Sequence, residues 1–231
     1  MKRSVHEIIR EKRQCAMHPD TQETAYELSI GSKGWHTRSY LPNFDQPGAI
    51  QMVTFRLADA MPASLRQEWE KFLQIEDQPE QRTALEAYLD QGRGACVLRD
   101  PRLASIVEAV LLRFDGARYR IAAWVVMPNH VHLLFELWHV PLGTLLKSWK
   151  GAAANHINRA LDRTGQLWQA DYWDRYMRDE EHFHKARHYI EHNPVKARLA
   201  STAEDWPFSS ANPKWRWSTG DRYGDGHLLN P

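Results

Sequence analysis

The stretch that decides the fold is WVVMPNHVHLLFEL, residues 124–137. It joins two runs rich in apolar and β-branched residues, Tyr119–Val126 and His130–Leu137, through the three residues 127–129. Runs of this length are typical of strands, and a Pro-Asn connection this short leaves room only for a tight turn. We therefore predict an antiparallel β-hairpin.

Upstream of this hairpin, the sequence predicts one strand and three helices. A strand is expected over Ile50–Ala58, because Val53, Phe55 and Leu57 alternate there with Met52, Thr54 and Arg56. Two short amphipathic helices are expected within residues 63–92, a mainly acidic stretch that should avoid nucleic acid. A stronger helix should begin at Pro101 and stop at Gly116, because apolar residues recur between them at helical spacing.

Downstream, a long helix is expected over residues 141–163 and a short extended segment over 167–177. A last helix should begin near Asp179, whose charge suits the positive end of the helix dipole, and end at Pro194. This order of elements is α+β. It predicts a ferredoxin-like sandwich, with a central antiparallel sheet and helices on one face.

The chain has 231 residues, 42% of them apolar, which is enough for one ordinary core and not for two large ones. We expect an N-terminal extension at residues 1–33, a main domain at 34–210 and a tail at 211–231. Residues 34–47 combine aromatic and turn residues, and we predict an ordered loop there that leads into the first strand.

Net charge and cysteine content bear on the kind of binding partner and on the cellular compartment. The formal net charge of +1 gives no sign of a nucleic-acid partner, so any basic surface must be local. Two cysteines cannot build a disulfide framework, which fits a reducing compartment. No stretch approaches the roughly 18 apolar residues of a membrane span, and the first residues are charged. We expect a cytoplasmic protein.

The hairpin carries a pair of histidines that could bind a metal ion. On a strand, His130 and His132 share one face and lie about 7 Å apart, close enough to hold one divalent ion. The alternative is that they are two polar residues on the solvent side of an edge hairpin. The pair alone does not decide between these two interpretations.

The last predicted helix adds a second candidate group. His182, Tyr189 and Asn193 form a stripe beside an apolar one, and the last two are four residues apart, so that a phenol and an amide project together. A tyrosine hydroxyl is a poor nucleophile at its usual pKa of about 10, and a nearby metal that polarises the electrophile would offset this. Alternatively, Tyr189 flanks the core and Asn193 only ends the helix.

Basic and aromatic side chains are interleaved between the hairpin and the last helix. This pattern suits single-stranded nucleic acid, whose phosphates pair with positive charge and whose unstacked bases lie on aromatic rings. The alternative is a solvated helix face with tryptophans in the core. The residues concerned are Lys147, Lys150, Arg159, Arg163, Trp168, Tyr172, Trp173, Arg175 and Arg178.

Several separate motifs resemble one family. WVVMPNHVHLLFEL at 124–137, LWQADYWDRYMRDEEH at 167–182 and HYIEHNPVKARL at 188–199 resemble the REP-associated tyrosine transposases. That family is a branch of the HUH single-strand nucleases, related to the insertion-sequence-200-type transposases. GWHTRSYLPNFD and QMVTFRLAD resemble the start of the same domain. The likeness runs in order from about Gly34 to about Ser210.

The resemblance implies a ferredoxin-like HUH fold with the histidine pair on a central strand. By the family's pattern, His130 and His132 would bind Mg²⁺ or Mn²⁺, and Asn193 would be a candidate third ligand. Tyr189 would attack a DNA phosphorus, release a 3′ hydroxyl and form a covalent 5′ phosphotyrosine. A second hydroxyl could then reverse the step and rejoin strands, without hydrolysis.

The resemblance also implies the substrate and the assembly. The chain would be a single-strand DNA endonuclease and strand transferase that recombines or transposes DNA at short repeat hairpins. We expect a monomer, which is nucleoid-associated when bound to DNA. The side chains expected near the DNA are Arg38, Tyr40, Lys147, Lys150, Arg175, Arg178, Lys196 and Arg198.

Two other functions stay open at this point. The first is a catalytically silent DNA-binding regulator of the same fold. The second is a metal-dependent nuclease without a covalent step, which would tolerate loss of the tyrosine hydroxyl. A C-terminal segment that contains Trp215 and Trp217 could also cover the site, as such segments can in relatives.

Overall fold

The computed structural model describes most of the predicted main domain. The residues it describes are 34–38, 41–45, 48–61, 87–88, 91–138 and 140–215. The predicted extension at 1–33, most of the two acidic helices at 63–92, and residues 216–231 lie outside the described residues.

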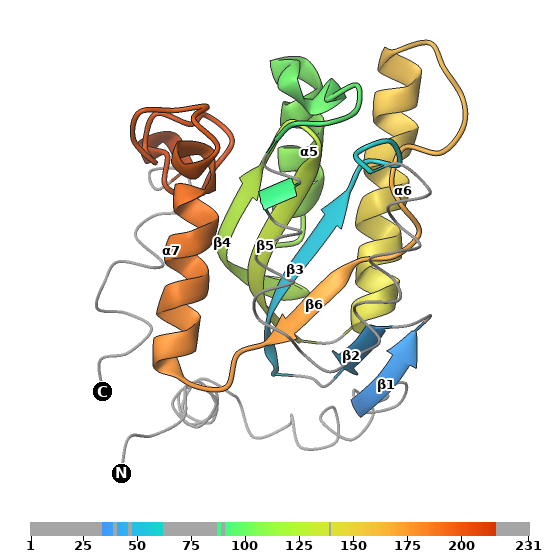
Figure 1. The fold of residues 1–231 in the computed structure, drawn as a ribbon. Helices are drawn as coiled ribbons and strands as arrows, with labels where there is room; N and C mark the ends of the chain where they lie inside the picture. Colours follow the sequence, from blue (N-terminus) through green and yellow to red (C-terminus); the bar gives the residue numbers. More distant parts are fainter. Residues whose placement is uncertain are drawn as a thin grey trace.

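The centre of the fold is a four-stranded antiparallel sheet (Figure 1). Its strands are β3 (Ile50–Arg56), β4 (Tyr119–Val126), β5 (His130–Leu137) and β6 (Trp173–Tyr176), in the order β4-β5-β3-β6. The predicted hairpin is confirmed as β4 and β5, and Met127 N–H donates to the His130 carbonyl across its turn at 2.9 Å. Because β5 lies between β4 and β3, its residues are completely covered.

Two helices connect these strands in the ferredoxin-like manner. Helix α5 (Pro101–Leu112) lies between β3 and β4 in the chain, and α6 (Leu142–Ala160) lies between β5 and β6. The resulting βαββαβ succession, with its first and third strands central in the sheet, confirms the predicted α+β ferredoxin-like sandwich. Both helices bury their apolar stripes against one face of the sheet, where Phe55, Leu133 and Phe135 belong to the main core.

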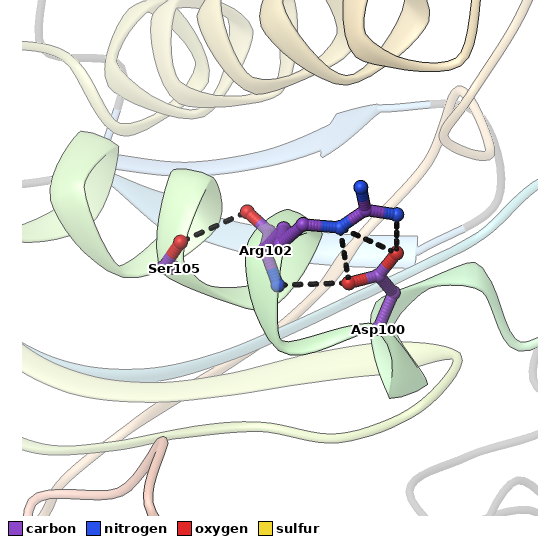
Figure 2. Close-up of polar contacts among 3 residues, drawn as sticks. All are labelled: Asp100, Arg102 and Ser105. Carbon is purple, nitrogen blue, oxygen red and sulfur yellow. Dashed lines mark hydrogen bonds and ion pairs between the residues drawn. The ribbon is translucent and has the colours of Figure 1, made fainter.

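Local capping explains why α5 begins where the sequence predicts. Asp100 accepts a hydrogen bond of 2.9 Å from the backbone N–H of Arg102, and Pro101 occupies the first turn, where its missing N–H costs nothing. Figure 2 shows the Arg102 guanidinium folded back onto the same carboxylate at 2.7 Å, and the Ser105 hydroxyl donating to the Arg102 carbonyl. This cap fixes the start of the helix. The helix ends at Leu112, and Gly116 follows in a left-handed conformation with φ of 78°.

Helix α7 (Glu180–Lys196) shows that the prediction of helices on one face only was wrong. This helix packs on the other face of the sheet, against β4 and β5, and Figure 1 shows it apart from α5 and α6. The reason is that the second face is apolar as well: Val125 and Leu134 pack there with Phe183 and Ile190. The main domain therefore has three layers.

Helix α7 begins where the sequence predicts but ends later than predicted. Asp179 caps the first turn by accepting from the backbone N–H of His182 at 2.8 Å, as predicted. Pro194 does not end the helix, contrary to the prediction. It lies inside the last turn, where its ring removes only one backbone hydrogen bond, and the helix continues to Lys196.

Residues 34–38 and 41–45 form a second small sheet where an ordered loop had been predicted. Strands β1 (Gly34–Arg38) and β2 (Leu41–Asp45) pair antiparallel, and β2 lies near β6. The alternation that marks a half-buried strand is weak in these five-residue runs, which is why the sequence favoured a loop.

The C-terminal segment covers the outer edge of β4. Val126 N–H donates to the Phe208 carbonyl and Ser210 N–H to the Trp124 carbonyl, both at 2.9 Å. Trp215 then packs edge-on against Trp124, within the core shared with α5 and α6. Trp215 is therefore on the face opposite the histidine pair and does not cover it, and Trp217 lies outside the described residues. Within the part of the chain that is described, no helix is long and apolar enough to cross a membrane.

Candidate functional site

The predicted histidine pair lies in the interior, at the start of β5. His130 and His132 are both fully buried, and their ring centroids are 4.6 Å apart. Both side chains project to the α7 face of the sheet, because residues two apart on a strand share a face. The alternative interpretation of the pair as solvent-facing residues of an edge hairpin is excluded by this burial.

His130 is held in one tautomer by the residue before it. Its Nδ1 lies 2.7 Å from the Oδ1 of Asn129, and the amide nitrogen of Asn129 donates to the Arg93 carbonyl at 3.0 Å. An amide oxygen can only accept, so Nδ1 carries the proton and Nε2 carries the lone pair. A histidine oriented in this way is ready to serve as a metal ligand.

His132 has a corresponding partner on the neighbouring strand. The Thr54 hydroxyl of β3 lies 2.7 Å from its Nδ1, and the two residues are directly paired in the sheet. The Nε2 of His132 is buried and has no hydrogen-bond partner among the described residues. A buried nitrogen in this state is what a bound cation would satisfy.

Burial and charge keep both imidazoles neutral. Burial, with smaller contributions from the positive charges of Arg56 and Lys196, lowers the pKa of His130 to about 3. Burial is also the main cause that lowers the pKa of His132, followed by His130 and Lys196. Only a neutral ring can bind a metal, so protonation of these two rings would not prevent metal binding near neutral pH.

Helix α7 brings the predicted tyrosine to this pair. The ring centroids of Tyr189 and His132 are 5.3 Å apart, and the side chain of Tyr189 is half-buried. The amide nitrogen of Asn193, one turn further along the helix, donates to the Tyr189 hydroxyl at 3.2 Å. Asn193 is fully buried. The apolar stripe of α7 that packs on the sheet sets this arrangement, as the helical spacing predicted.

Lys196 completes the group on α7. Its ammonium nitrogen lies 5.3 Å from the centroid of the Tyr189 ring. Its charge contributes to the lowered pKa of both histidines. The structure therefore brings together His130, His132, Tyr189, Asn193 and Lys196. Arg198, two residues later, is exposed and has a left-handed backbone with φ of 58°.

Sequence reasoning missed Arg56. This arginine at the end of β3 is only 8% exposed, is paired in the sheet with His130, and donates from Nε to the side-chain oxygen of Gln169. The alternation within Ile50–Ala58 puts Thr54 and Arg56 on one face, but only the pairing of β3 with β5 shows that this face is the one with the histidines.

Two of the remaining predicted DNA contacts lie away from the site. Lys147 and Lys150 lie on α6, on the other face of the sheet, and the Lys150 ammonium donates to the carbonyls of Gln169 and Ala170 at 2.6 and 2.7 Å. Lys147 lines a pocket of about 330 Å³ between α6 and residues 165–172.

The other four residues lie along the β6 edge and its surroundings or outside the described chain. Arg175 lies on β6 and Arg178 precedes α7, and both are exposed. Arg38 is the last residue of β1, and Tyr40 lies outside the described residues. His182 lies in the first turn of α7, where its backbone N–H donates to the cap residue Asp179. It is about two helical turns from Tyr189. Within the described residues, no cluster of three or more His, Cys, Asp or Glu side chains could hold a metal.

Comparison with known proteins finds one family model that matches part of the chain. The sequence model of the family described as "Transposase IS200 like" matches residues 98–193, a range that includes the histidine pair, Tyr189 and Asn193. This part of the chain is similar to IS200-like transposases. The resemblance that the separate motifs indicated is thereby confirmed.

Two curated relatives match part of this chain. A putative REP-associated tyrosine transposase of Haemophilus influenzae is 27% identical over 103 residues, which are 40% of this chain and 58% of that protein. The REP-associated tyrosine transposase of Escherichia coli K12 is 29% identical over 94 residues, 40% of this chain and 54% of that protein. The chain thus spans little more than half the length of these relatives.

A solved structure is also similar. It is a REP-associated tyrosine transposase bound to a REP hairpin, 18% identical to this chain, with a TM-score of 0.48. The similarity covers 76% of this chain and 81% of that one.

Proposed function

We propose that this chain is a DNA endonuclease and strand transferase that acts on single-stranded repeat hairpins through Tyr189. The observation that carries the proposal is the position of the Tyr189 hydroxyl, which receives a hydrogen bond from Asn193 beside the buried His130–His132 pair. The match of residues 98–193 to the transposase family model makes DNA the substrate to test first.

The residues present fit a divalent ion, Mg²⁺ or Mn²⁺, at the histidine pair. His130 and His132 would hold it through Nε2, since their Nδ1 atoms are engaged by Asn129 and Thr54. Asn193 would offer its side-chain oxygen, the ligand type that these hard ions prefer. When bound, the ion supplies positive charge to a non-bridging phosphate oxygen.

The chain's own residues account for the bond changes. The Tyr189 oxygen forms a bond to phosphorus as the bond from phosphorus to the 3′ oxygen breaks. The phenol proton is released and the departing 3′ oxygen takes up one proton, so a 5′ phosphotyrosine and a free 3′ hydroxyl result. Asn193 orients the phenol oxygen, and the Lys196 ammonium favours its negative charge.

One chain supplies the whole group, which supports a monomer as the working unit. The two histidines lie on β5 and the tyrosine on α7 of the same chain, and the ring of Tyr189 already contacts the ring of His132. No exchange of α7 between two copies is needed. We propose that Arg38, Tyr40, Arg175, Arg178 and Arg198 contact the DNA around this group.

The test is to incubate the chain with end-labelled hairpin DNA from the flanks of its own gene, with and without Mn²⁺, and to run a denaturing protein gel. A labelled protein band that needs the metal and is absent in Tyr189→Phe is expected. DNA binding without a band under any metal would reduce the protein to a silent DNA-binding regulator. Cleavage without a band would instead indicate a hydrolytic nuclease.

A further inference from the structure

A tryptophan outside the group described above lies on the same row of the sheet as His132. Trp173 of β6 is paired with Thr54 of β3, and Thr54 is paired with His132 of β5. Side chains of directly paired residues project to the same face. Trp173 is therefore two strands from His132, a separation of roughly 10 Å at the usual spacing of strands.

The indole of Trp173 is held by a buried arginine. The guanidinium carbon of Arg56 lies 5.1 Å from the centroid of the indole, and Arg56 Nε donates to the Gln169 side chain. Arg56 itself is paired in the sheet with His130. One face of the ring is thus fixed beside the histidine pair.

Among the described elements, α7 covers β4 and β5 and not the part of this face at β6. Helix α7 packs on β4 and β5, whereas Trp173 belongs to β6, on the other side of β3. The Trp173 side chain is accordingly only half-buried, although its Nε1 is covered and has no hydrogen-bond partner among the described residues. A flat aromatic surface that is fixed, partly exposed and flanked by an arginine is suited to stacking with a nucleobase.

We propose that Trp173 stacks an unpaired base of the DNA strand that lies at the histidine pair, one or two nucleotides from the phosphate that Tyr189 attacks. The inference rests on the proposed function, because it takes the strand at Tyr189 as given. The ligand is a single-stranded nucleotide, since a base within a duplex has both of its faces covered by its neighbours. Stacking tolerates every base, so Trp173 fixes the position of the strand more than its sequence.

The experiment measures binding separately from chemistry. The full chain carrying Tyr189→Phe is titrated, in EDTA, into fluorescein-labelled hairpins from its own flanks, and anisotropy gives Kd. A set of hairpins has one abasic nucleotide each, moved stepwise through the unpaired flank. Adding Trp173→Ala should weaken binding to the intact hairpin about tenfold, within the range of one lost stacking contact.

The decisive result is a loss that is not additive. At one abasic position, the missing base should raise the Kd of the Tyr189→Phe chain about tenfold. The same missing base should leave the Kd of the chain that also carries Trp173→Ala unchanged. Equal losses in both chains at every position would overturn the proposed stacking and leave the proposed function intact. If the Tyr189→Phe chain bound no hairpin at all, both the stacking and the proposed function would fall.

Two further variants separate stacking from packing. Trp173→Leu keeps an apolar side chain in the sheet without an aromatic face, and should behave like Trp173→Ala; retention of normal binding would contradict the proposal. Trp138→Ala is the matched control, because Trp138 is also half-buried under an arginine, Arg120, but follows the far end of β5. It should leave the abasic profile unchanged, and a profile altered as in Trp173→Ala would also contradict the proposal.

Discussion

Asn193 donates a 3.2 Å hydrogen bond to the hydroxyl of Tyr189, one helical turn before it, and the ring of Tyr189 lies beside that of His132. We propose two roles for the Asn193 amide: its nitrogen orients the phenol, and its oxygen would coordinate a cation. Two substitutions separate these purposes.

Asn193→Asp keeps an oxygen for a cation and removes the N–H donor, whereas Asn193→Ala removes both. We expect Asn193→Asp to slow formation of the covalent adduct about 10- to 100-fold while Mn²⁺ affinity is kept, because the phenol loses its orienting partner. Asn193→Ala should slow adduct formation and also weaken Mn²⁺ binding. Adduct formation on a gel and Mn²⁺ titration by calorimetry measure the two effects. Normal adduct formation in Asn193→Ala would show that neither purpose matters.

Thr54 should matter for metal binding although it would not itself touch the metal. Its hydroxyl fixes the ring of His132 through Nδ1, and loss of such an orienting partner typically costs 10- to 100-fold in metal affinity. We therefore expect weaker Mn²⁺ binding in Thr54→Val, which keeps the shape but not the hydroxyl. Thr54→Ser keeps the hydroxyl and is the control. Equal Mn²⁺ affinities in both variants would contradict this role.

The buried histidines should make the metal-free protein sensitive to mild acid. His130 has a pKa of about 3 when folded and about 6.5 when unfolded, so the unfolded chain takes up a proton that the folded chain does not. Stability from this group is complete above pH 6.5 and is lost as pH falls towards 3, by about 2 kcal/mol at pH 5.

The measurement is urea unfolding in EDTA between pH 7 and pH 5, a window chosen to lie above the titration of most carboxylates. His130→Gln should flatten the dependence of the unfolding free energy on pH, whatever its effect at pH 7. His156→Gln is the control, because this histidine is exposed on α6, away from the buried pair. A His130→Gln chain with the slope of the parent would exclude the buried imidazole as the cause.

Lys150 should stabilise the fold and contribute little to DNA binding. Its ammonium donates to the carbonyls of Gln169 and Ala170 in the segment that leads into β6. We expect Lys150→Met to lower the free energy of unfolding by about 1–3 kcal/mol, since it leaves backbone acceptors unsatisfied. Lys147→Met, three residues earlier and exposed, should change it little. Thermal unfolding and hairpin binding test both variants, and a loss of DNA affinity without a loss of stability would restore the original prediction for Lys150.

The contrast between Lys150 and the histidines shows what the sequence could and could not predict. The placement of His130 with His132, and of Tyr189 with Asn193, could be predicted because strand and helix periodicities put each pair on one face of one element, a local property. The carbonyls that accept from Lys150 lie about twenty residues away in an irregular segment. Helix and strand periodicity cannot predict such a contact. A charged residue between aromatic residues was therefore assigned to DNA.

The side of the sheet that α7 covers and the position of Arg56 were not predicted for a similar reason. The apolar face of α7 was predicted, but the sheet face that it covers was not. The face of β5 that carries His130 and His132 is buried although it is partly polar, and the sequence pattern did not show that a helix covers it. Arg56 is 74 residues from His130 in the chain, and its importance follows only from the antiparallel register of β3 and β5. Register between distant strands is a tertiary property.

Lys196 provides the sharpest test of the chemistry, because two roles make opposite predictions for salt dependence. Its ammonium lies over the Tyr189 ring, where it would favour the negative phenol oxygen. We expect Lys196→Met to slow adduct formation at saturating DNA about tenfold or more, while the slope of log affinity against log salt stays the same. Arg198→Met, an exposed neighbour proposed to contact phosphate, should do the reverse and lower that slope by about one. If Lys196→Met lowers the salt slope and leaves the rate at saturation unchanged, Lys196 binds DNA and does not act on the tyrosine.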